Sequence, residues 1–229
     1  NGEYLGKRPN GYISFWYDIT PYLKFGTNNL IAVKVDHTQD GDSRWYTGSG
    51  IYRDVKLIIT NRVYIKQWGI YCTAPEVTKE RASLSVKTDI VNETGKKMKV
   101  LVSNILTYKG REIGSAQKKI TVEAGAGSLL SQNIMVENPE LWDVDDPNLY
   151  MLETRIKCRK MTDIVVTPVG FRTVRFDADK GFFLNDKSLK LKGICMHHDA
   201  GSLGSAVPKE ELARRLDILK DMGCNAIRT

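Results

Sequence analysis

The sequence lacks the features that would assign it to a membrane, zinc or redox class. No uninterrupted apolar run among its 229 residues is long enough to cross a bilayer, so membrane insertion is not expected. It has four cysteines, and no two of them stand in a Cys-x-x-Cys spacing, so nothing supports a zinc or dithiol redox motif. The spacing leaves a Cys72–Cys158 disulfide open.

Dense runs of positive charge are also missing, although the chain carries a formal net charge of +7. Its lysines and arginines are spread along the sequence, and the closest groups are pairs: Lys96-Lys97, Lys118-Lys119 and Arg214-Arg215. A nucleic-acid interface gathers basic residues on one face or along one helix. The observed distribution instead fits solvated sheet surfaces, and no nucleic-acid partner is expected.

What the sequence does contain is mostly β pattern. Residues 1–61 predict a sheet, with an aromatic and β-branched run at Tyr12–Ile19 and a further strand at Ile51–Ile59. Leu30–Val35 is an almost continuous apolar run, which predicts a strand buried on both faces. The first of these strands has no partner before it, so we expect the chain to begin inside a domain.

Residues 62–173 predict an immunoglobulin-like β-sandwich. The alternation is clearest at Arg81–Asn92, where Ala82 and Leu84 fall on one face and Ser83 on the other. Turn residues separate this run from similar ones, and about seven short strands in about a hundred residues are typical of such a sandwich. The other predicted strands are Val63–Cys72, Lys99–Tyr108, Lys118–Val122, Leu129–Val136, Tyr150–Ile156 and Ile164–Val169.

The pattern changes in residues 174–229. An Asn185-Asp186 turn predicts a small hairpin, and Ser188–Lys192 predicts a strand. Leucines at helical spacing follow and end at Gly223, where a helix stops; Cys224–Thr229 then predicts a second, parallel strand. Two parallel strands and one helix cannot cover both faces of a sheet, so we expect the chain to stop inside a domain.

Four residues with useful chemistry fall at the carboxyl ends of these two strands: His197, His198, Asp199 and Arg228. In strand–helix–strand units, the loops at this end carry the functional residues. A metal site would combine Cys195 with the histidines and Asp199, but neighbours in a strand point to opposite faces, so these side chains cannot all converge. No metal site is predicted, and Cys195 itself is expected to be buried within its strand.

The four tryptophans could bind a ligand in another way, because an indole ring offers a flat face on which a ligand can stack. Packing in a core or at a sheet edge is the favoured interpretation for Trp16, Trp45, Trp68 and Trp142. Trp45, which lies in a loop with several glycines, is the exception that deserves a direct test.

Short motifs follow one another along essentially the whole chain, and their order and spacing are more specific than any one of them. They are Asn1-Gly2, Tyr17–Thr20, Asn29–Val33, Ser49–Val55, Leu141-Trp142, Pro147–Tyr150, Gly170–Arg172, Phe183–Asn185, Leu191–Gly193 and Asn225–Thr229. In this order they resemble glycoside hydrolase family 2, which contains β-galactosidases, β-glucuronidases and β-mannosidases.

The resemblance implies a mostly β, multidomain architecture. Residues 1–61 would be the C-terminal part of a jelly-roll sugar-binding domain, 62–173 the immunoglobulin-like sandwich, and 174–229 the first βαβ unit of a (β/α)8 TIM barrel. Family members are retaining glycosidases that use two glutamates with carboxyl groups about 5 Å apart. No cofactor is expected. In the family both glutamates lie further along the barrel. The resemblance therefore assigns no catalytic residue here, and this chain alone should be inactive.

The resemblance does assign substrate-binding residues. His197 matches a histidine that lines the subsite for the non-reducing sugar, Asp199 an acidic position that faces sugar hydroxyls, and Arg228 an arginine near the catalytic carboxylates. Members vary at the position of His198, whose role stays open between a site residue and an ordinary loop residue. The loop around Asp42 resembles a region where the jelly roll reaches the active site in some members.

The pattern at Met196–Ala206 resembles the galactosidase branch more than the glucuronidase branch. We therefore expect a retaining O-glycosyl hydrolase, most like a β-galactosidase, with a β-glycoside as its carbohydrate partner. A homo-oligomer and the compartment stay open, although a periplasmic or other extracytoplasmic location would fit an enzyme that degrades polysaccharide. The competing hypothesis is a non-catalytic β-sandwich module that binds carbohydrate or protein; the βαβ unit counts against it.

Overall fold

The computed structural model describes residues 1–38 and 48–229, so Asp42 and Trp45 lie outside the described residues. Contacts divide the chain into two units, and each joins an early stretch of the sequence to a late one. Unit 1 consists of Asn1–Asp54 and His197–Pro208; unit 2 consists of Val55–Met196 and Lys209–Thr229.

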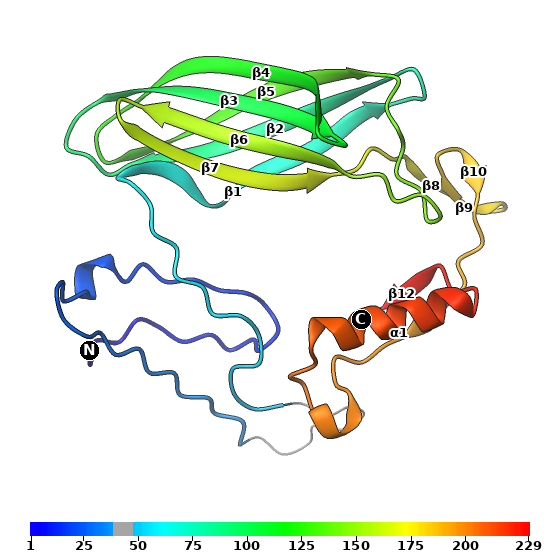
Figure 1. Ribbon diagram of the computed structural model, residues 1–229, viewed down its shortest axis with the longest axis horizontal. Helices are drawn as coiled ribbons and strands as arrows, with labels where there is room; N and C mark the ends of the chain where they lie inside the picture. The colour runs from blue at the N-terminus through cyan, green and yellow to red at the C-terminus, as the bar shows by residue number, and fades with distance from the viewer. Residues whose placement is uncertain (39–47) are drawn as a thin grey trace. The chain divides into compact units, whose positions relative to one another are not determined.

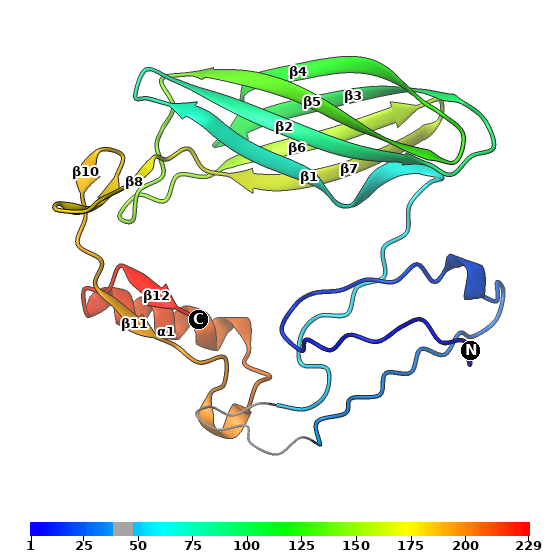
Figure 2. The same ribbon diagram turned by 180° about the vertical axis from the view of Figure 1, so that it is seen from behind.

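Seven strands of unit 2 form a β-sandwich, which Figures 1 and 2 show from its two sides. One sheet has the strand order β1-β2-β5 and the other the order β4-β3-β6-β7, and all neighbouring strands are antiparallel. The predicted immunoglobulin-like sandwich is thereby confirmed. Its strands are β1 (Val63–Val77), β2 (Arg81–Asn92), β3 (Met98–Tyr108), β4 (Arg111–Val122), β5 (Ala126–Glu137), β6 (Tyr150–Cys158) and β7 (Met161–Val169).

The alternating sequence explains why the two sheets face each other. Along β2, the side chains of Ala82, Leu84 and Val86 are fully buried, and the residues between them point away from the core. β3 repeats the pattern with buried Val100 and Val102. Each fully buried valine or leucine of this kind stabilises the fold by about 1.5–3 kcal/mol relative to an exposed one.

The core also contains a polar contact that joins the two sheets. Asn104 on β3 donates from Nδ2 to Oε1 of Gln132 on β5 at 3.1 Å, and Thr154 on β6 donates from Oγ1 to Oδ1 of Asn104 at 2.6 Å. Asn104 and Thr154 are fully buried. Because a buried polar atom is costly when it lacks a partner, this network favours one relative register of the two sheets.

A three-stranded antiparallel sheet follows the sandwich, with the order β10-β9-β8. Its strands are β8 (Val174–Asp177), β9 (Gly181–Leu184) and β10 (Lys187–Ser188). Asn185 and Asp186 connect β9 to β10 with φ angles of 50° and 62°. Asn and Asp tolerate this left-handed region, as a two-residue hairpin turn requires, and the predicted hairpin is confirmed.

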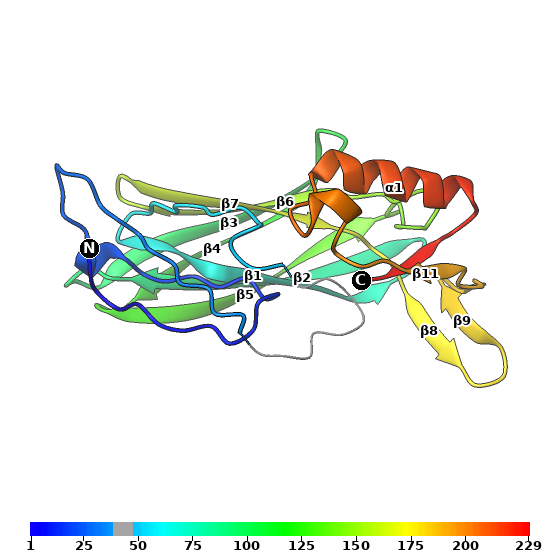
Figure 3. The same ribbon diagram turned by 90° about the horizontal axis from the view of Figure 1, so that it is seen from below.

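A parallel strand pair ends the chain, and the helix lies between the two strands in sequence. The elements are β11 (Gly193–Cys195), α1 (Lys209–Asp221) and β12 (Ala226–Arg228); β11 and α1 can be followed in Figure 3. Gly223 has a φ of 85°, which is the left-handed conformation that commonly ends a helix. The predicted strand–helix–strand unit, the start of a TIM barrel, is therefore present.

The bounds of its first strand were predicted wrongly. The parallel strand begins at Gly193, after the expected Ser188–Lys192. The side chain of Asn225 replaces a strand partner before that point: its Nδ2 donates to the Lys190 carbonyl at 3.1 Å, and its Oδ1 accepts from the Lys192 N–H at 2.8 Å. Cys195 is exposed and not buried as expected, since β12 is the only strand that pairs with β11 within residues 1–38 and 48–229.

The strands expected at Tyr12–Ile19, Leu30–Val35 and Ile51–Ile59 are not formed in the described part of residues 1–61. That part contains one short 3-10 helix, η1 (Thr20–Tyr22). A strand requires a partner that pairs with it residue by residue, and these runs have no such partner within residues 1–38 and 48–61. Leu30 is hydrogen-bonded to Asn1 but is 73% exposed. The expectation of burial on both faces was therefore wrong, while the jelly-roll assignment itself stays a prediction.

Candidate functional site

The carboxyl ends of β11 and β12 lie side by side. Cys195 is opposite Arg228 in the parallel register, and the Met196 N–H donates to the Arg228 carbonyl at 2.8 Å. At the other end of the pair, a Cβ on Gly193 would lie 3.1 Å from the Ala226 carbonyl oxygen, which explains why a glycine suits this close approach. The strand pair thus fixes where the loop after β11 begins.

That loop, His197–Pro208, belongs to unit 1. It folds back on itself through a short 3-10 helix, η2 (Gly201–Leu203), and the Ala200 N–H donates to the Gly204 carbonyl at 3.0 Å. Gly201 and Gly204 have φ angles of 51° and 57°, which glycine adopts without strain. These two glycines therefore allow a compact loop shortly after the two histidines.

The structure places the predicted site residues in both units. His197 is exposed and Asp199 is half-buried, and they share the loop of unit 1. Arg228 is exposed at the end of β12 and belongs to unit 2. Two of the three predicted residues are thus brought together by their place in one loop, and the third stands at the carboxyl end of the neighbouring strand.

The first part of unit 1 contacts this loop through residues that the sequence had not singled out. The ring of His198 lies edge-on to Tyr12, with centroids 5.4 Å apart, and is stacked on Tyr52 at 6.1 Å. Arg53 donates from Nη1 to the Ser205 carbonyl at 3.4 Å. The sequence marked Tyr12 only as part of an aromatic run and Tyr52 and Arg53 only as part of the motif Ser49–Val55, and neither pattern predicts a contact with this loop.

The carboxylates nearest to this loop in sequence are Glu210 and Glu211, in the first turn of α1. Glu211 accepts hydrogen bonds from Arg214 at 2.7 and 2.8 Å and from Arg215 at 3.1 Å. These two guanidinium groups lower the pKa of Glu211 from 4.5 to about 2. Glu211 therefore stays ionised at neutral pH and does not fit the role of a general acid.

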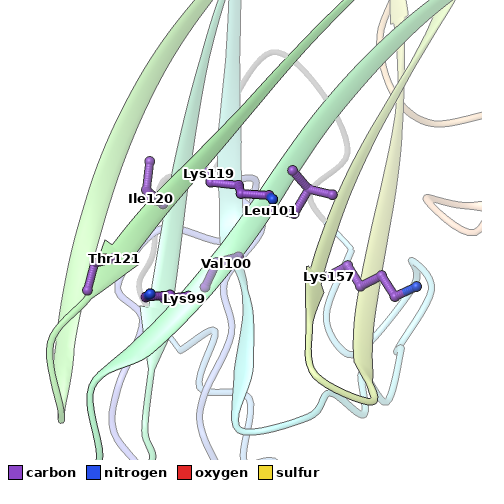
Figure 4. Close-up of a pocket in the computed structure, with 7 residues that line it drawn as sticks. All are labelled: Lys99, Val100, Leu101, Lys119, Ile120, Thr121 and Lys157. Carbon is purple, nitrogen blue, oxygen red and sulfur yellow. The ribbon is translucent and has the colours of Figure 1, made fainter.

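A hollow of about 440 Å³ lies against β3, β4 and β6 of the sandwich (Figure 4). Glycoside hydrolysis requires two neighbouring carboxyl groups. None of the residues that line the hollow is acidic, so it does not provide that chemistry. The lining residues are Lys99, Val100, Leu101, Lys119, Ile120, Thr121 and Lys157.

The described tryptophans differ in their surroundings. Trp142 packs at the end of the sandwich, where the Arg172 guanidinium lies 4.7 Å from its ring centroid, as edge packing predicts. Trp16 and Trp68 are 46% and 62% exposed, so the packing expected for them is not observed. Trp68 has a φ of 57° and lies in an irregular part of β1, next to Gly69, where the register with β2 shifts.

The cysteines are the other side chains for which the sequence left a chemical role open. Cys72 and Cys158 are free thiols, so the disulfide left open by the sequence is not formed, and burial raises the pKa of both. Within residues 1–38 and 48–229, no three His, Cys, Asp or Glu side chains are grouped so that they could hold a metal ion. No helix in this part of the chain is both long and apolar enough to cross a membrane.

Comparison with protein families gives two adjoining matches. The model described as "Glycosyl hydrolases family 2" matches residues 63–172, which correspond to the sandwich. The model described as "Glycosyl hydrolases family 2, TIM barrel domain" matches residues 176–229, from the small antiparallel sheet to β12.

Individual proteins give similar matches over nearly the whole chain. A β-galactosidase of Bacteroides ovatus, BoGH2A, is 45% identical over 100% of this chain and 27% of its own length. A family 2 glycosyl hydrolase structure from Bacteroides cellulosilyticus has a TM-score of 0.92 and 35% identity over 98% of this chain and 31% of that chain. The Bacteroides uniformis β-glucuronidase 2, covalently bound to cyclophellitol-6-carboxylate aziridine, has a TM-score of 0.86 and 34% identity over 93% of this chain and 27% of that one. The chain thus spans between a quarter and a third of the length of these relatives.

Proposed function

The chain belongs to glycoside hydrolase family 2, and from this premise we propose that the full-length gene product is a retaining β-glycosidase that releases terminal β-galactose. The immunoglobulin-like sandwich and the first βαβ unit of the barrel are the parts of such an enzyme that this chain contains. In this proposal the sandwich is a scaffold, and the sugar is bound by residues that follow the barrel strands.

The observation that carries the galactose assignment is the loop Met196–Ala206, whose sequence resembles that of the galactosidase branch. The 45% identity to a β-galactosidase over the whole chain supports it. A β-glucuronidase also matches, at 34% identity, so glucuronides are the substrates against which galactosides must be compared.

We assign three residues to sugar binding. His197, exposed at the start of the loop, would exchange hydrogen bonds with hydroxyls of the non-reducing sugar, and Asp199 would accept hydrogen bonds from hydroxyls in the same subsite. Arg228 would lie near the nucleophilic carboxylate and keep it ionised at neutral pH. Hydrogen bonds of this kind strengthen as the sugar becomes oxocarbenium-like, which is how they contribute to the rate.

The 229-residue chain by itself should not hydrolyse glycosides. The family mechanism uses two glutamates, and the resemblance matches neither of them to a residue of this sequence. Glu211, one of the two carboxylates nearest to the proposed site in sequence, is held in ion pairs by Arg214 and Arg215. This chain therefore contributes binding groups and scaffold to the proposed reaction.

Hydrolysis of a panel of aryl β-glycosides tests the proposal. The full-length gene product, the 229-residue chain and a full-length His197→Ala variant are each assayed with the galactoside, glucuronide, mannoside and glucoside. We expect the full-length protein to cleave the galactoside fastest, the variant to lose most of that activity, and the 229-residue chain to cleave none of them.

Cleavage of the glucuronide or mannoside alone would show that the family mechanism holds and that the galactose assignment is wrong. Absence of hydrolysis by the full-length protein, together with saturable glycan binding by the 229-residue chain, would favour the binding-module alternative.

A further inference from the structure

The ring of His198 lies in an aromatic cluster formed with two tyrosines from the opposite end of the sequence. Its centroid is 5.4 Å from that of Tyr12, edge to face, and 6.1 Å from that of Tyr52, with the planes 30° apart. Both distances fall within the range in which aromatic pairs attract each other. We propose that His198 is a positioning residue, whose ring anchors the loop that presents His197 and Asp199 to the sugar.

The Nε2 atom of His198 does not explain the position of the ring. Its Nε2 is buried and has no hydrogen-bond partner among the described residues. A buried ring nitrogen without a partner opposes folding, so the contacts made by the faces and edges of the ring must account for its place in the cluster. The inference is that this position requires an aromatic ring and does not require an imidazole.

A second contact fixes the far end of the same loop. Arg53, next to Tyr52 in sequence, donates to the Ser205 carbonyl at 3.4 Å, and its guanidinium carbon lies 5.0 Å from the Tyr52 ring centroid. Tyr52 therefore touches both His198 and Arg53. The consecutive residues Tyr52 and Arg53 hold the loop near its beginning and near its end.

The neighbours of His198 make this anchoring relevant to the sugar site. His197 is exposed, whereas His198 is half-buried, so the chain turns one histidine toward solvent and the next into the cluster. Asp199 follows directly. A loop anchored between these two residues holds them in one arrangement before the sugar binds, which reduces the entropy lost on binding. This step rests on the proposed function of His197 and Asp199.

Two substitutions in the full-length gene product distinguish the role of an aromatic ring at position 198 from the role of the imidazole nitrogens. His198→Ala removes the ring, and His198→Phe keeps an aromatic ring and removes the unpaired nitrogen. In His198→Ala we expect the amides of residues 197–205 to exchange with solvent roughly 5- to 50-fold faster, because two aromatic contacts are lost. In His198→Phe we expect exchange within about twofold of the wild type and an equal or higher melting temperature.

The same variants should differ in KM and kcat for the aryl β-glycoside that the wild type cleaves. His198→Ala should raise KM roughly tenfold and lower kcat less, since loss of anchoring weakens sugar binding. His198→Phe should remain close to the wild type. Tyr52→Phe and Tyr52→Ala should repeat this contrast, and Tyr4→Ala is the matched control, because Tyr4 is a tyrosine of the same unit that is 79% exposed.

Two results would overturn the inference. If His198→Phe loses as much activity as His198→Ala while His198→Gln retains it, the imidazole itself binds the sugar. If loop exchange in His198→Ala equals that of the wild type, the ring anchors nothing. The exchange measurement does not depend on activity, so it decides the positioning role even if the full-length protein cleaves none of the glycosides.

Discussion

The sandwich of unit 2 and the first 38 residues of unit 1 are both rich in apolar side chains, but they differ in how far these side chains are buried. In the sandwich, Leu84 and Leu152 are fully buried between sheets whose strands are close in sequence. In unit 1, Phe25 and Leu30 are 85% and 73% exposed, and the loop that joins this segment in one unit begins at residue 197. An apolar run becomes a buried strand only where a partner strand and a second layer are available.

The same contrast applies to function. The sandwich is well packed, and its hollow is lined by lysines, a threonine and apolar residues without a carboxylate. The loop after β11 has a small packed interior, yet it carries the histidines and the aspartate on which the proposed chemistry depends. Stable regions and binding regions often separate in this way, because binding loops come from the less stable part of a fold.

Amide hydrogen exchange of the 229-residue chain should show the largest difference between the two kinds of region. The helix α1 has no buried residue, and Ile194 and Ile227 of the strand pair are 37% and 40% exposed. We expect residues 180–229 to exchange roughly three or more powers of ten faster than β2, β3 and β6, which open only with global unfolding. Strong protection of residues 180–229 in an isolated monomer would contradict this comparison.

Leucine truncations in the two regions should differ next most strongly. Leu84→Ala removes a fully buried side chain and should lower the free energy of unfolding by about 2–5 kcal/mol. Leu216→Ala on α1, where the leucine is 41% exposed, should change it by about 0.5 kcal/mol or less. Urea unfolding followed by tryptophan fluorescence measures both variants. Equal losses would show that α1 is packed as firmly as the sandwich.

Within the sandwich, the stability contribution of the buried Thr154 hydroxyl can be compared with that of an exposed threonine hydroxyl. Thr154→Val removes the hydroxyl that donates to Asn104 and leaves a buried amide oxygen without that donor. We expect a loss of about 1–3 kcal/mol in the free energy of unfolding. Thr121→Val, at an exposed position of β4, is the matched control and should be nearly neutral. A neutral Thr154→Val would mean that water satisfies Asn104 equally well.

The smallest effect concerns the pH dependence of α1. The folded-state pKa of Glu211 is lowered from 4.5 to about 2 by Arg214 and Arg215, so its ion pairs stabilise the helix above pH 4.5. That contribution is lost as the pH falls from 4.5 to about 2, because the carboxylate then takes up a proton. An NMR titration of the Glu211 carboxyl should show a midpoint well below 4.5, and Arg214→Gln should move it upward. A midpoint near 4.5 in the unsubstituted chain would contradict the ion pairs.

Much of unit 2 could be predicted from local pattern. Arg81–Asn92 was bounded correctly as β2, because strict alternation and a following turn define both ends of the strand. The Asn185-Asp186 hairpin was found because both residues tolerate positive φ. These signals require only neighbouring residues, so a single sequence was sufficient.

Other features depend on contacts between distant residues and could not be read in this way. The strand predicted at Ser188–Lys192 failed because the Asn225 side chain occupies the hydrogen-bonding positions of a partner strand. For the site, sequence adjacency already placed His197 and Asp199 in one loop. The contact of His198 with Tyr12 joins residues that are far apart in the sequence, so no local sequence pattern predicts it.

We propose that the sugar is bound at the loop after β11 and not on the sandwich. This is tested by comparing kcat/KM for an aryl β-galactoside in two variants of the full-length gene product, His197→Ala and Lys119→Ala, the latter in the hollow of the sandwich. We predict a loss of roughly 100-fold or more for His197→Ala, because hydrogen bonds that tighten in the transition state are removed, and a change within about twofold for Lys119→Ala. Wild-type activity in His197→Ala, or an equal loss in Lys119→Ala, would contradict the claim.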